Sequence, residues 1–315
     1  MYHQMIHEMG RVPVKELFMR YDVILIGGSY AGLSAALQLA RARRRILVVD
    51  AGRRRNRAVS HSHGFLTQDG MPPAEIAETA RMQVLAYPTV DWVQGAVEDV
   101  AGQADAFTVT LSDGTTREAR RLIVAAGVED VLPVLPGLAE RWGRQVFHCP
   151  YCHGYELGGT GIGVLASSDL AMHQALMLPD WGETTLFLND AFVPDAAQHD
   201  QLRARGTRVV GGAVARLEGE GPGVDIVMDN GRVFALSGLF VATSLRPAPL
   251  VLRMGLATEE SPMGVTLRTD AMKATSTPGI FACGDVARAA GSVAFAVGDG
   301  AMAGMATHRS LMFGL

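Results

Sequence analysis

One stretch near the N-terminus constrains the fold more than any other. Residues 22–52 read DVILIGGSYAGLSAALQLARARRRILVVDAG. This pattern predicts a buried strand over 23–26, a glycine turn, a helix over about 30–43 and a second strand over 46–49 that ends in Asp50. A βαβ unit with an acidic residue about 20 positions after its turn is typical of dinucleotide binding. The pattern therefore predicts a nucleotide-binding domain of the α/β class.

The residues of the turn suit a pyrophosphate. Gly27 permits the tight turn, and Gly32 permits close packing of the helix on the sheet. The first turn of the helix offers free N–H groups and a positive dipole end, and Asp50 can accept hydrogen bonds from a ribose. Ser29 occupies the second glycine position of G-x-G-x-x-G, but its side chain is small enough for a phosphate to approach. For this motif alone, an ordinary buried βα unit is the alternative.

An internal repeat supports a second domain of the same kind. Residues 107–127 and 224–244 each predict a hairpin with an Asp-Gly or Asn-Gly turn, followed by a buried strand. Residues 161–178 and 184–190 repeat the strand, turn, helix and strand order of the N-terminal unit. The sequence thus predicts two related dinucleotide-type domains.

Length and charge exclude several classes of protein. A chain of 315 residues can bury two cores, and its net charge of −4 gives no reason to expect a nucleic-acid partner. Arginines gather at 41–45, where we expect them to complement the end of a helix, and again at 53–57. Residues 1–20 lack the apolar core of a signal peptide, and no run approaches the ~20 apolar residues of a membrane span. We expect a cytoplasmic protein with no membrane partner.

The motif HCPYCHGYE, residues 148–156, carries chemistry of its own. Three cysteines cannot form a disulfide framework, and in a reducing compartment a Cys-x-x-Cys pair is more often redox-active or metal-binding. A structural zinc site would use His148, Cys149, Cys152 and His153. Ligands adjacent in sequence rarely converge on one tetrahedral ion, so we expect no metal, and metal analysis of the purified protein would discriminate the two alternatives.

Three motifs in order identify a family resemblance: GGSYAG with Asp50, the Cys-x-x-Cys pair, and GIFACGDV at 279–286. From Tyr21 to about Met312, the chain resembles the low-molecular-weight thioredoxin reductases and related two-domain flavoproteins. The resemblance implies two Rossmann-like, three-layer ββα domains. The first, which binds FAD, would span 21–129 and 246–315, the second 130–245, and residues 1–20 would be an extension. It also implies a homodimer.

The resemblance implies that FAD lies across the first domain. The helix that starts near Ser292 would direct its positive end toward the flavin, with Ser292 as N-cap. Cys283 would be a small core residue. The implied contacts are Gly27, Ser29, Tyr30, Ala31 and Gly32 at the pyrophosphate, Asp50 and Ala51 at the adenosine ribose, Val97 near the adenine, Ala126 and Gly127 along the cofactor, Gly284 and Asp285 at the ribityl chain, and Ser292 and Val293 at the last helix.

The resemblance also assigns roles to the cysteine pair. Cys152 would face the flavin, and Cys149 would exchange with substrate. Pro150 stiffens the short disulfide ring at a helix start, where the dipole favours a thiolate. His153 stands where the reductases usually carry an aspartate. With an ordinary pKa of ~6.5, a histidine can take a thiol proton at neutral pH better than a carboxylate can.

The second domain departs from the reductase pattern. Ala166 and Ser168 occupy the glycine positions of the NADPH turn, and the next strand ends in Asn189 and Asp190 instead of basic residues. An acid there repels a ribose phosphate, although Asp190 could accept a hydrogen bond from the 2′-hydroxyl of NADH. These departures argue against NADPH and resemble the NADPH-independent branch, the dithiol oxidases of gliotoxin and holomycin type. His61 and His63 would then contact the flavin or substrate, or belong to a polar surface loop.

We therefore expect an FAD-dependent thiol:disulfide oxidoreductase. Electrons would pass from a substrate dithiol to the Cys-x-x-Cys disulfide, then to the flavin, and then to oxygen or another acceptor. The substrate would be a small dithiol or a thioredoxin-like protein. The alternative is a thioredoxin reductase-type enzyme that reduces a protein disulfide with electrons from NAD(P)H or ferredoxin.

Overall fold

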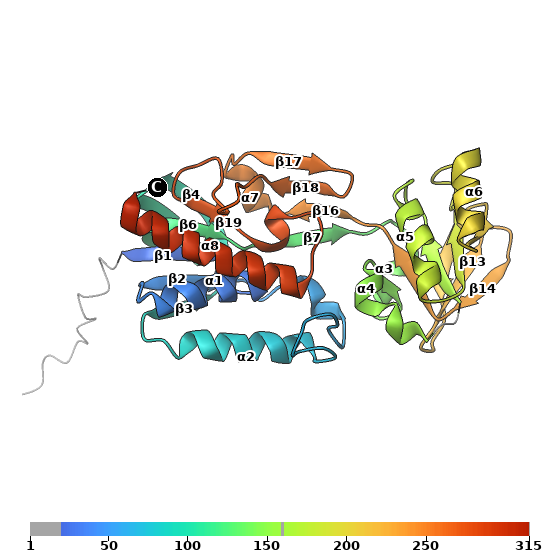
Figure 1. The fold of residues 1–315 in the computed structure, drawn as a ribbon, viewed down its shortest axis with the longest axis horizontal. Coiled ribbons are helices and arrows are strands. Elements are labelled where there is room, and N and C mark those ends of the chain that lie inside the picture. Colours follow the sequence, from blue (N-terminus) through green and yellow to red (C-terminus); the bar gives the residue numbers. More distant parts are fainter. Residues whose placement is uncertain (1–19, 159–160, 315) are drawn as a thin grey trace, which may run out of the picture.

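The structure is a computed structural model that describes residues 20–158 and 161–314. It contains two α/β bodies, which lie side by side along the long axis of the molecule and are joined by two strands (Figure 1). This confirms the predicted fold class of two nucleotide-type domains. The expected N-terminal extension, apart from Arg20, lies outside the described residues.

The first body is built on a seven-stranded sheet. Its strands are β1 (Tyr21–Ile26), β2 (Ile46–Asp50), β3 (Val90–Gln94), β4 (Val97–Gln103), β5 (Ala106–Leu111), β6 (Thr116–Val124) and β19 (Ile280–Ala282). The order is β3-β2-β1-β6-β5-β4, with β19 beside β6. Strand β1 runs parallel to β2 and β6, whereas β5 pairs antiparallel with β4 and β6. The predicted βαβ unit and the predicted hairpin both belong to this sheet.

Helices cover one face of this sheet, and a smaller set of elements covers the other. Apolar residues of α1 (Tyr30–Arg41), α2 (Pro73–Leu85) and α8 (Val293–Phe313) share a core with the sheet. The opposite core includes residues of α7 (Pro249–Arg253) and β18 (Gly264–Leu267), the latter paired with β17 (Thr258–Ser261). The carboxyl ends of the parallel strands of this sheet point toward the second body (Figure 1).

The second body repeats this plan on a smaller scale. A parallel sheet has the order β11-β10-β9-β15-β8, and a three-stranded antiparallel sheet, β12-β13-β14, lies beside it. The strands are β8 (Val146–Phe147), β9 (Ile162–Leu165), β10 (Thr184–Phe187), β11 (Arg208–Val210), β12 (Val214–Glu218), β13 (Val224–Met228), β14 (Val233–Leu236) and β15 (Gly238–Val241); the helices are α3 (Leu138–Arg141), α4 (Pro150–His153), α5 (Ala171–Met177) and α6 (Ala196–Ala204). The predicted internal repeat is therefore present.

Two antiparallel strands connect the bodies (Figure 1). Strand β7 (Val128–Val131) leaves the first body, and β16 (Ser244–Pro247) returns to it. Val131 lies opposite Ser244, so the chain enters and leaves the second body at the same place. The expected domain boundaries, after residues 129 and 245, fall within these two strands.

Small residues bring α1 and α8 into close contact. A Cβ atom on Gly300 would overlap the carbonyl oxygen of Ala31. We expect Gly300→Ala to lower the free energy of unfolding by about 1–3 kcal/mol, because the two helix backbones must separate. Urea unfolding measures the change.

Gly298→Ala is the matched control for this prediction. Gly298 lies on the same helix, and nothing approaches the position of its missing Cβ. Its replacement should leave stability unchanged or raise it by up to about 1 kcal/mol, because alanine has the higher helix propensity. Equal stability of the two variants would contradict the close helix crossing.

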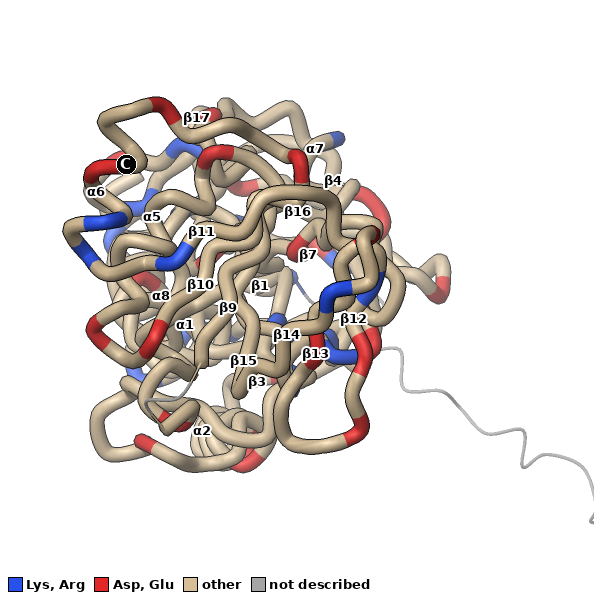
Figure 2. The backbone as a smooth tube through the Cα atoms, turned by 90° about the vertical axis from the view of Figure 1, so that its right-hand side faces the viewer, with Lys and Arg blue, Asp and Glu red and all other residues tan. Residues whose placement is uncertain are grey.

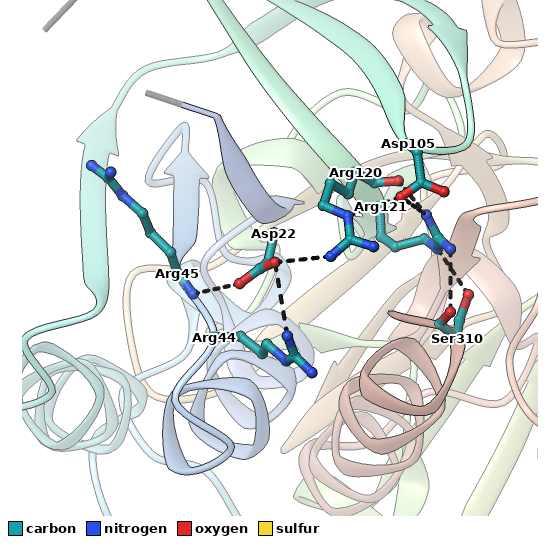
Figure 3. A network of polar contacts seen from close by, with 7 residues as sticks. All are labelled: Asp22, Arg44, Arg45, Asp105, Arg120, Arg121 and Ser310. Atoms are coloured by element: carbon teal, nitrogen blue, oxygen red, sulfur yellow. Dashed lines mark hydrogen bonds and ion pairs between the residues drawn. The ribbon is translucent and has the colours of Figure 1, made fainter. Parts of the chain in front are cut away.

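Ion pairs and hydrogen bonds stabilise the amino-terminal end of the seven-stranded sheet (Figure 3). The Asp22 carboxylate accepts hydrogen bonds from the backbone N–H of Arg45, at 3.1 Å, and from Arg120, at 3.4 Å. Arg121 is buried and donates through Nε to the Ser310 hydroxyl at 2.8 Å.

The sequence prediction that the arginines at 41–45 lie in the last turn of a helix was wrong in part, because only Arg41 lies in the last turn of α1. Seen from the side of the second body, residues of both charge signs are spread over the backbone (Figure 2).

Candidate functional site

The glycine turn after β1 has the conformation that the sequence predicts. Gly27 has φ +107°, its N–H donates to the Val49 carbonyl at 2.8 Å, and a Cβ there would overlap the carbonyl oxygen of Ala125. Gly28 donates its N–H to Asp50 Oδ1 at 3.1 Å. One oxygen of Asp50 therefore holds the turn.

The turn leads directly into α1. A Cβ on Gly32 would overlap the carbonyl oxygen of Gly27, so the helix packs against the turn as expected. The Ser29 side chain accepts no hydrogen bond from the first turn of the helix. First-turn N–H groups have no intrahelical partners, and with the positive dipole end they suit a bound phosphate.

A cleft of about 1240 Å³, the solvent in its mouth included, lies between the two bodies. The second body contributes Phe147, His148, Cys152 and His153 to its wall. The first body contributes nine of the residues that the resemblance assigns to FAD: Ser29, Tyr30, Ala31, Ala126, Gly127, Gly284, Asp285, Ser292 and Val293. The fold therefore brings these cofactor candidates and the cysteine motif together.

Five further cofactor candidates lie outside this wall. Gly27 and Gly32 lie behind it and shape the turn. Val97 is buried in the core on the far face of the sheet, where it belongs to the same cluster as Phe107. The contacts of Asp50 and Ala51 with the ribose, and of Val97 with the adenine, stay predictions.

The residues at the cleft fit an FAD. Gly127 has φ +66°, and the space where its Cβ would stand is open. Ser292 is the N-cap of α8, as predicted, because its hydroxyl accepts the N–H of Phe295 at 3.1 Å. The start of this 21-residue helix therefore places a positive dipole end at the cleft. When bound there, FAD would supply a two-electron acceptor.

Cys149 and Cys152 form a disulfide, with their Cα atoms 5.3 Å apart. Cys152 lies in the wall of the cleft, whereas Cys149 does not belong to the lining. The helix expected after Cys149 is the single turn α4, which continues as a 3-10 turn at Tyr155–Leu157. The expected stabilisation of a thiolate at the start of this helix stays a prediction. Cys283 is free and fully buried, and its burial raises the pKa of its thiol to about 12.

His153 is less basic than the sequence suggested. Its ring stacks on Phe147 with centroids 4.3 Å apart. Burial, together with the nearby histidines His148 and His63, lowers the pKa of His153 to about 4. Burial and Arg55 lower the pKa of His148 to about 4 as well. Both imidazoles are therefore neutral at pH 7, and His153 can accept a proton but holds it weakly.

His61 and His63 lie in an irregular segment before α2, and both line the cleft. His61 is exposed, and its Nδ1 lies 3.0 Å from the Ser60 hydroxyl. His63 is half-buried, and its Nδ1 lies 3.4 Å from Glu156 Oε1 in the second body. A contact of either histidine with flavin or substrate stays a prediction.

Sequence reasoning missed Arg55, Asp130 and Phe147, which also line the cleft. Arg55 belongs to the arginine-rich run after β2, and Phe147 lies two residues before Cys149 of the Cys-x-x-Cys motif. The sequence could therefore have indicated these two residues, one by the arginine-rich run and the other by its closeness to the cysteines. Asp130 carried no comparable signal, because nothing in its neighbourhood on the chain indicates its partner.

The turn after β9 is held by contacts within the protein. Ala166 is fully buried, and its carbonyl accepts a hydrogen bond from the Asn189 side chain at 3.4 Å. The same side chain accepts the N–H of Val214 at 2.9 Å. The Ser168 hydroxyl accepts the N–H of Leu170 at 3.3 Å. Asn189 thus joins the turn to the segment before β12, at the edge where a nicotinamide nucleotide would bind.

Two other findings bear on partners. Within residues 20–158 and 161–314, no group of three or more His, Cys, Asp or Glu side chains is arranged to hold a metal ion. In the same described part of the chain, every helix is too short or too polar to span a membrane.

Comparisons with known proteins agree with this geometry. The family model described as pyridine nucleotide-disulphide oxidoreductase matches residues 21–300. Thioredoxin reductase tcpT from Claviceps purpurea is 34% identical over 92% of this chain and 94% of its own.

Two solved structures are also similar. An oxidoreductase from Agrobacterium tumefaciens has 58% sequence identity and a TM-score of 0.90, and the match covers 94% of this chain and 99% of that one. The protein HlmI has 38% identity and a TM-score of 0.86, over 93% and 92% of the two chains.

Proposed function

The chain belongs to the pyridine nucleotide-disulphide oxidoreductase family, and we propose that it oxidises dithiols without a nicotinamide cofactor. It is an FAD-dependent oxidoreductase of the thioredoxin reductase-like type. In the proposed reaction, electrons leave a substrate dithiol through the Cys149–Cys152 disulfide and the flavin, and oxygen is the final acceptor. The observation that carries the proposal is the position of Cys152 in the wall of the FAD cleft. The turn after β9, which has Ala166 and Ser168 at the glycine positions and is hydrogen-bonded to Asn189, supports the absence of a nicotinamide cofactor.

The protein's own residues account for the exchange of the disulfide. A substrate thiolate attacks the sulfur of Cys149, the Cys149–Cys152 bond breaks, and Cys152 leaves as a thiolate. The second substrate thiol then attacks the mixed disulfide and releases Cys149. The substrate loses two electrons and two protons, and the cysteine pair gains the two electrons. We assign the first of these protons to the neutral imidazole of His153.

Dithiothreitol in air tests this proposal. We expect the FAD-loaded protein to consume oxygen when dithiothreitol is added, and its flavin absorbance to bleach once oxygen is exhausted. Bleaching without oxygen uptake would leave the disulfide chemistry intact and point to another acceptor. Absence of both signals would refute the proposed oxidation.

Anaerobic addition of NADPH and NADH tests the reductase alternative. The buried Ala166 at a glycine position of the turn and the exposed Asp190 support slow or no flavin reduction by either nucleotide. Rapid reduction by one of them would overturn our interpretation of this turn. Reduction by ferredoxin alone would favour a protein disulfide as the substrate.

The remaining features concern substrate, assembly and location. We propose a small dithiol or a thioredoxin-like protein as substrate, and a homodimer as the working form in the cytoplasm. The exposed side chains of Phe295, Met302 and Met305 along α8 support an interface between two copies of the chain.

A further inference from the structure

Arg55 is a half-buried arginine between the cleft and the connecting strands, at the start of the short 3-10 helix Arg55–Ala58. Its Nε and Nη2 atoms donate to the two carboxylate oxygens of Asp130, at 2.8 and 2.6 Å. Its Nη1 atom donates to Asp285 at 2.9 Å. The side chains of Arg55, Asp130 and Asp285 are only 17%, 7% and 18% exposed. One guanidinium therefore joins three segments that are distant in the sequence.

Asp130 extends this contact to both connections between the bodies. It lies in β7, opposite Leu245 of β16. Its Oδ1 atom also accepts the hydroxyl of Thr243 at 2.8 Å, and Thr243 directly precedes β16. The carboxylate of Asp130 therefore links both connecting segments, at β7 and before β16, to Arg55. On the other side of Arg55, Asp285 belongs to the cofactor wall of the first body.

The ion pair is charged despite its burial. Burial alone would raise the pKa of Asp130, but the hydrogen bonds from Arg55 outweigh it and leave this pKa below its ordinary value. Burial alone would lower the pKa of Arg55, but Asp130 and Asp285 outweigh it and raise this pKa above its ordinary value. Removal of one partner leaves the other buried and unpaired, which is strongly unfavourable. The pair thus resists opening around neutral pH.

We propose that Arg55 is a positioning residue that fixes the angle between the two bodies, by holding Asp130 and Thr243 of the connecting segments against Asp285. Cys152 lies beyond these connections, on the opposite wall of the cleft from Asp285. A rotation about β7 and β16 would move its sulfur away from the cofactor wall. Only the kinetic consequence, slower reduction of the flavin, rests on the function proposed above.

The test compares variants of the full-length, FAD-loaded protein. We expect Asp130→Asn to change the small-angle X-ray scattering profile and to slow anaerobic flavin reduction by dithiothreitol about 10²-fold, since small misplacements of reacting groups cost rates of this order. Thr243→Val removes one hydrogen bond and keeps both charges, so its effect should have the same direction and a smaller size. Arg246→Met is the matched control: it removes an exposed ion pair with Glu129, 3.8 Å long, from the same strand pair, and should change neither quantity.

Each result decides the proposal. An unchanged scattering profile in Asp130→Asn would overturn it, whether or not the reduction slows, because slower reduction alone would indicate a local effect at the flavin. If Asp130→Asn loses FAD or unfolds, the test rests on Thr243→Val. A Thr243→Val protein with the scattering profile and the flavin reduction rate of the wild type would then overturn the proposal. A wild-type protein that dithiothreitol does not reduce would refute the proposed function, whereas the scattering comparison would still test Arg55.

Discussion

A Cys152→Ser variant, loaded with FAD, is expected to consume oxygen with dithiothreitol at least about 10³-fold more slowly than the wild type. Without the Sγ atom of Cys152 no disulfide closes, and a substrate thiolate has no S–S bond to attack. Loss of Cys149 should have an effect of the same size, since both cysteines act as one unit. Oxygen consumption at saturating dithiothreitol measures both variants.

Tyr151→Phe is the matched control, because Tyr151 lies between the two cysteines with its side chain 75% exposed. Its ring contacts Trp181 edge-on, and the variant keeps that ring. FAD content and melting temperature must match the wild type in all variants. Appreciable turnover by Cys152→Ser would show that thiols reduce the flavin directly, and the proposed path through the disulfide would be wrong.

Replacement of His153 by asparagine is expected to lower kcat for dithiol oxidation by about 10²-fold. Asparagine cannot accept the proton that a substrate thiol must lose. The wild-type imidazole, with its pKa lowered to about 4, stays neutral well below pH 7. The wild-type rate should therefore show no loss from His153 protonation between pH 7 and 5. A variant with the kcat of the wild type at every pH would remove His153 from the mechanism.

Stability provides a second readout for the same variant. The pKa of His153 is about 4 in the folded protein and ordinarily near 6.5, so protons bind more tightly to the unfolded chain. This residue's share of stability is complete above about pH 6.5 and is lost as the pH falls toward 4. We expect the wild type to lose up to about 3 kcal/mol more unfolding free energy over this range than His153→Asn. Equal losses would show that His153 is not buried as described.

The nucleotide-binding frame could be predicted because its determinants are local. Gly27 must adopt a positive φ, Gly32 must pack against the turn, and Asp50 follows a strand of apolar residues. Each of these requirements restricts the residue type at one position, and all the positions lie within about 30 residues, which is the length of a βαβ unit. The same holds for Ser292, whose capping role depends only on the helix that follows it.

The properties of the site that depend on tertiary contacts could not be predicted. The pKa of His153 is low because burial, with the ring stacked on Phe147, disfavours its charged form, and the neighbouring residues Cys152 and Gly154 in the sequence do not indicate that burial. Arg55 finds its carboxylate 75 residues away, in a strand that reads as an ordinary connection. The Asn189 side chain donates a hydrogen bond to the carbonyl of Ala166, in a turn that the sequence shows only as lacking glycines.

The direct pairing of Val131 with Ser244 has a consequence for how such chains can be rebuilt. Because the chain leaves and re-enters the first body at adjacent points, the second body is an insertion whose two ends nearly meet. A loop of a few residues could replace it without disturbing the seven-stranded sheet, and a different sulfur-bearing module could be grafted at the same junction. The seven-stranded sheet is thus complete without the inserted body, whereas the Cys149–Cys152 disulfide lies within the insertion.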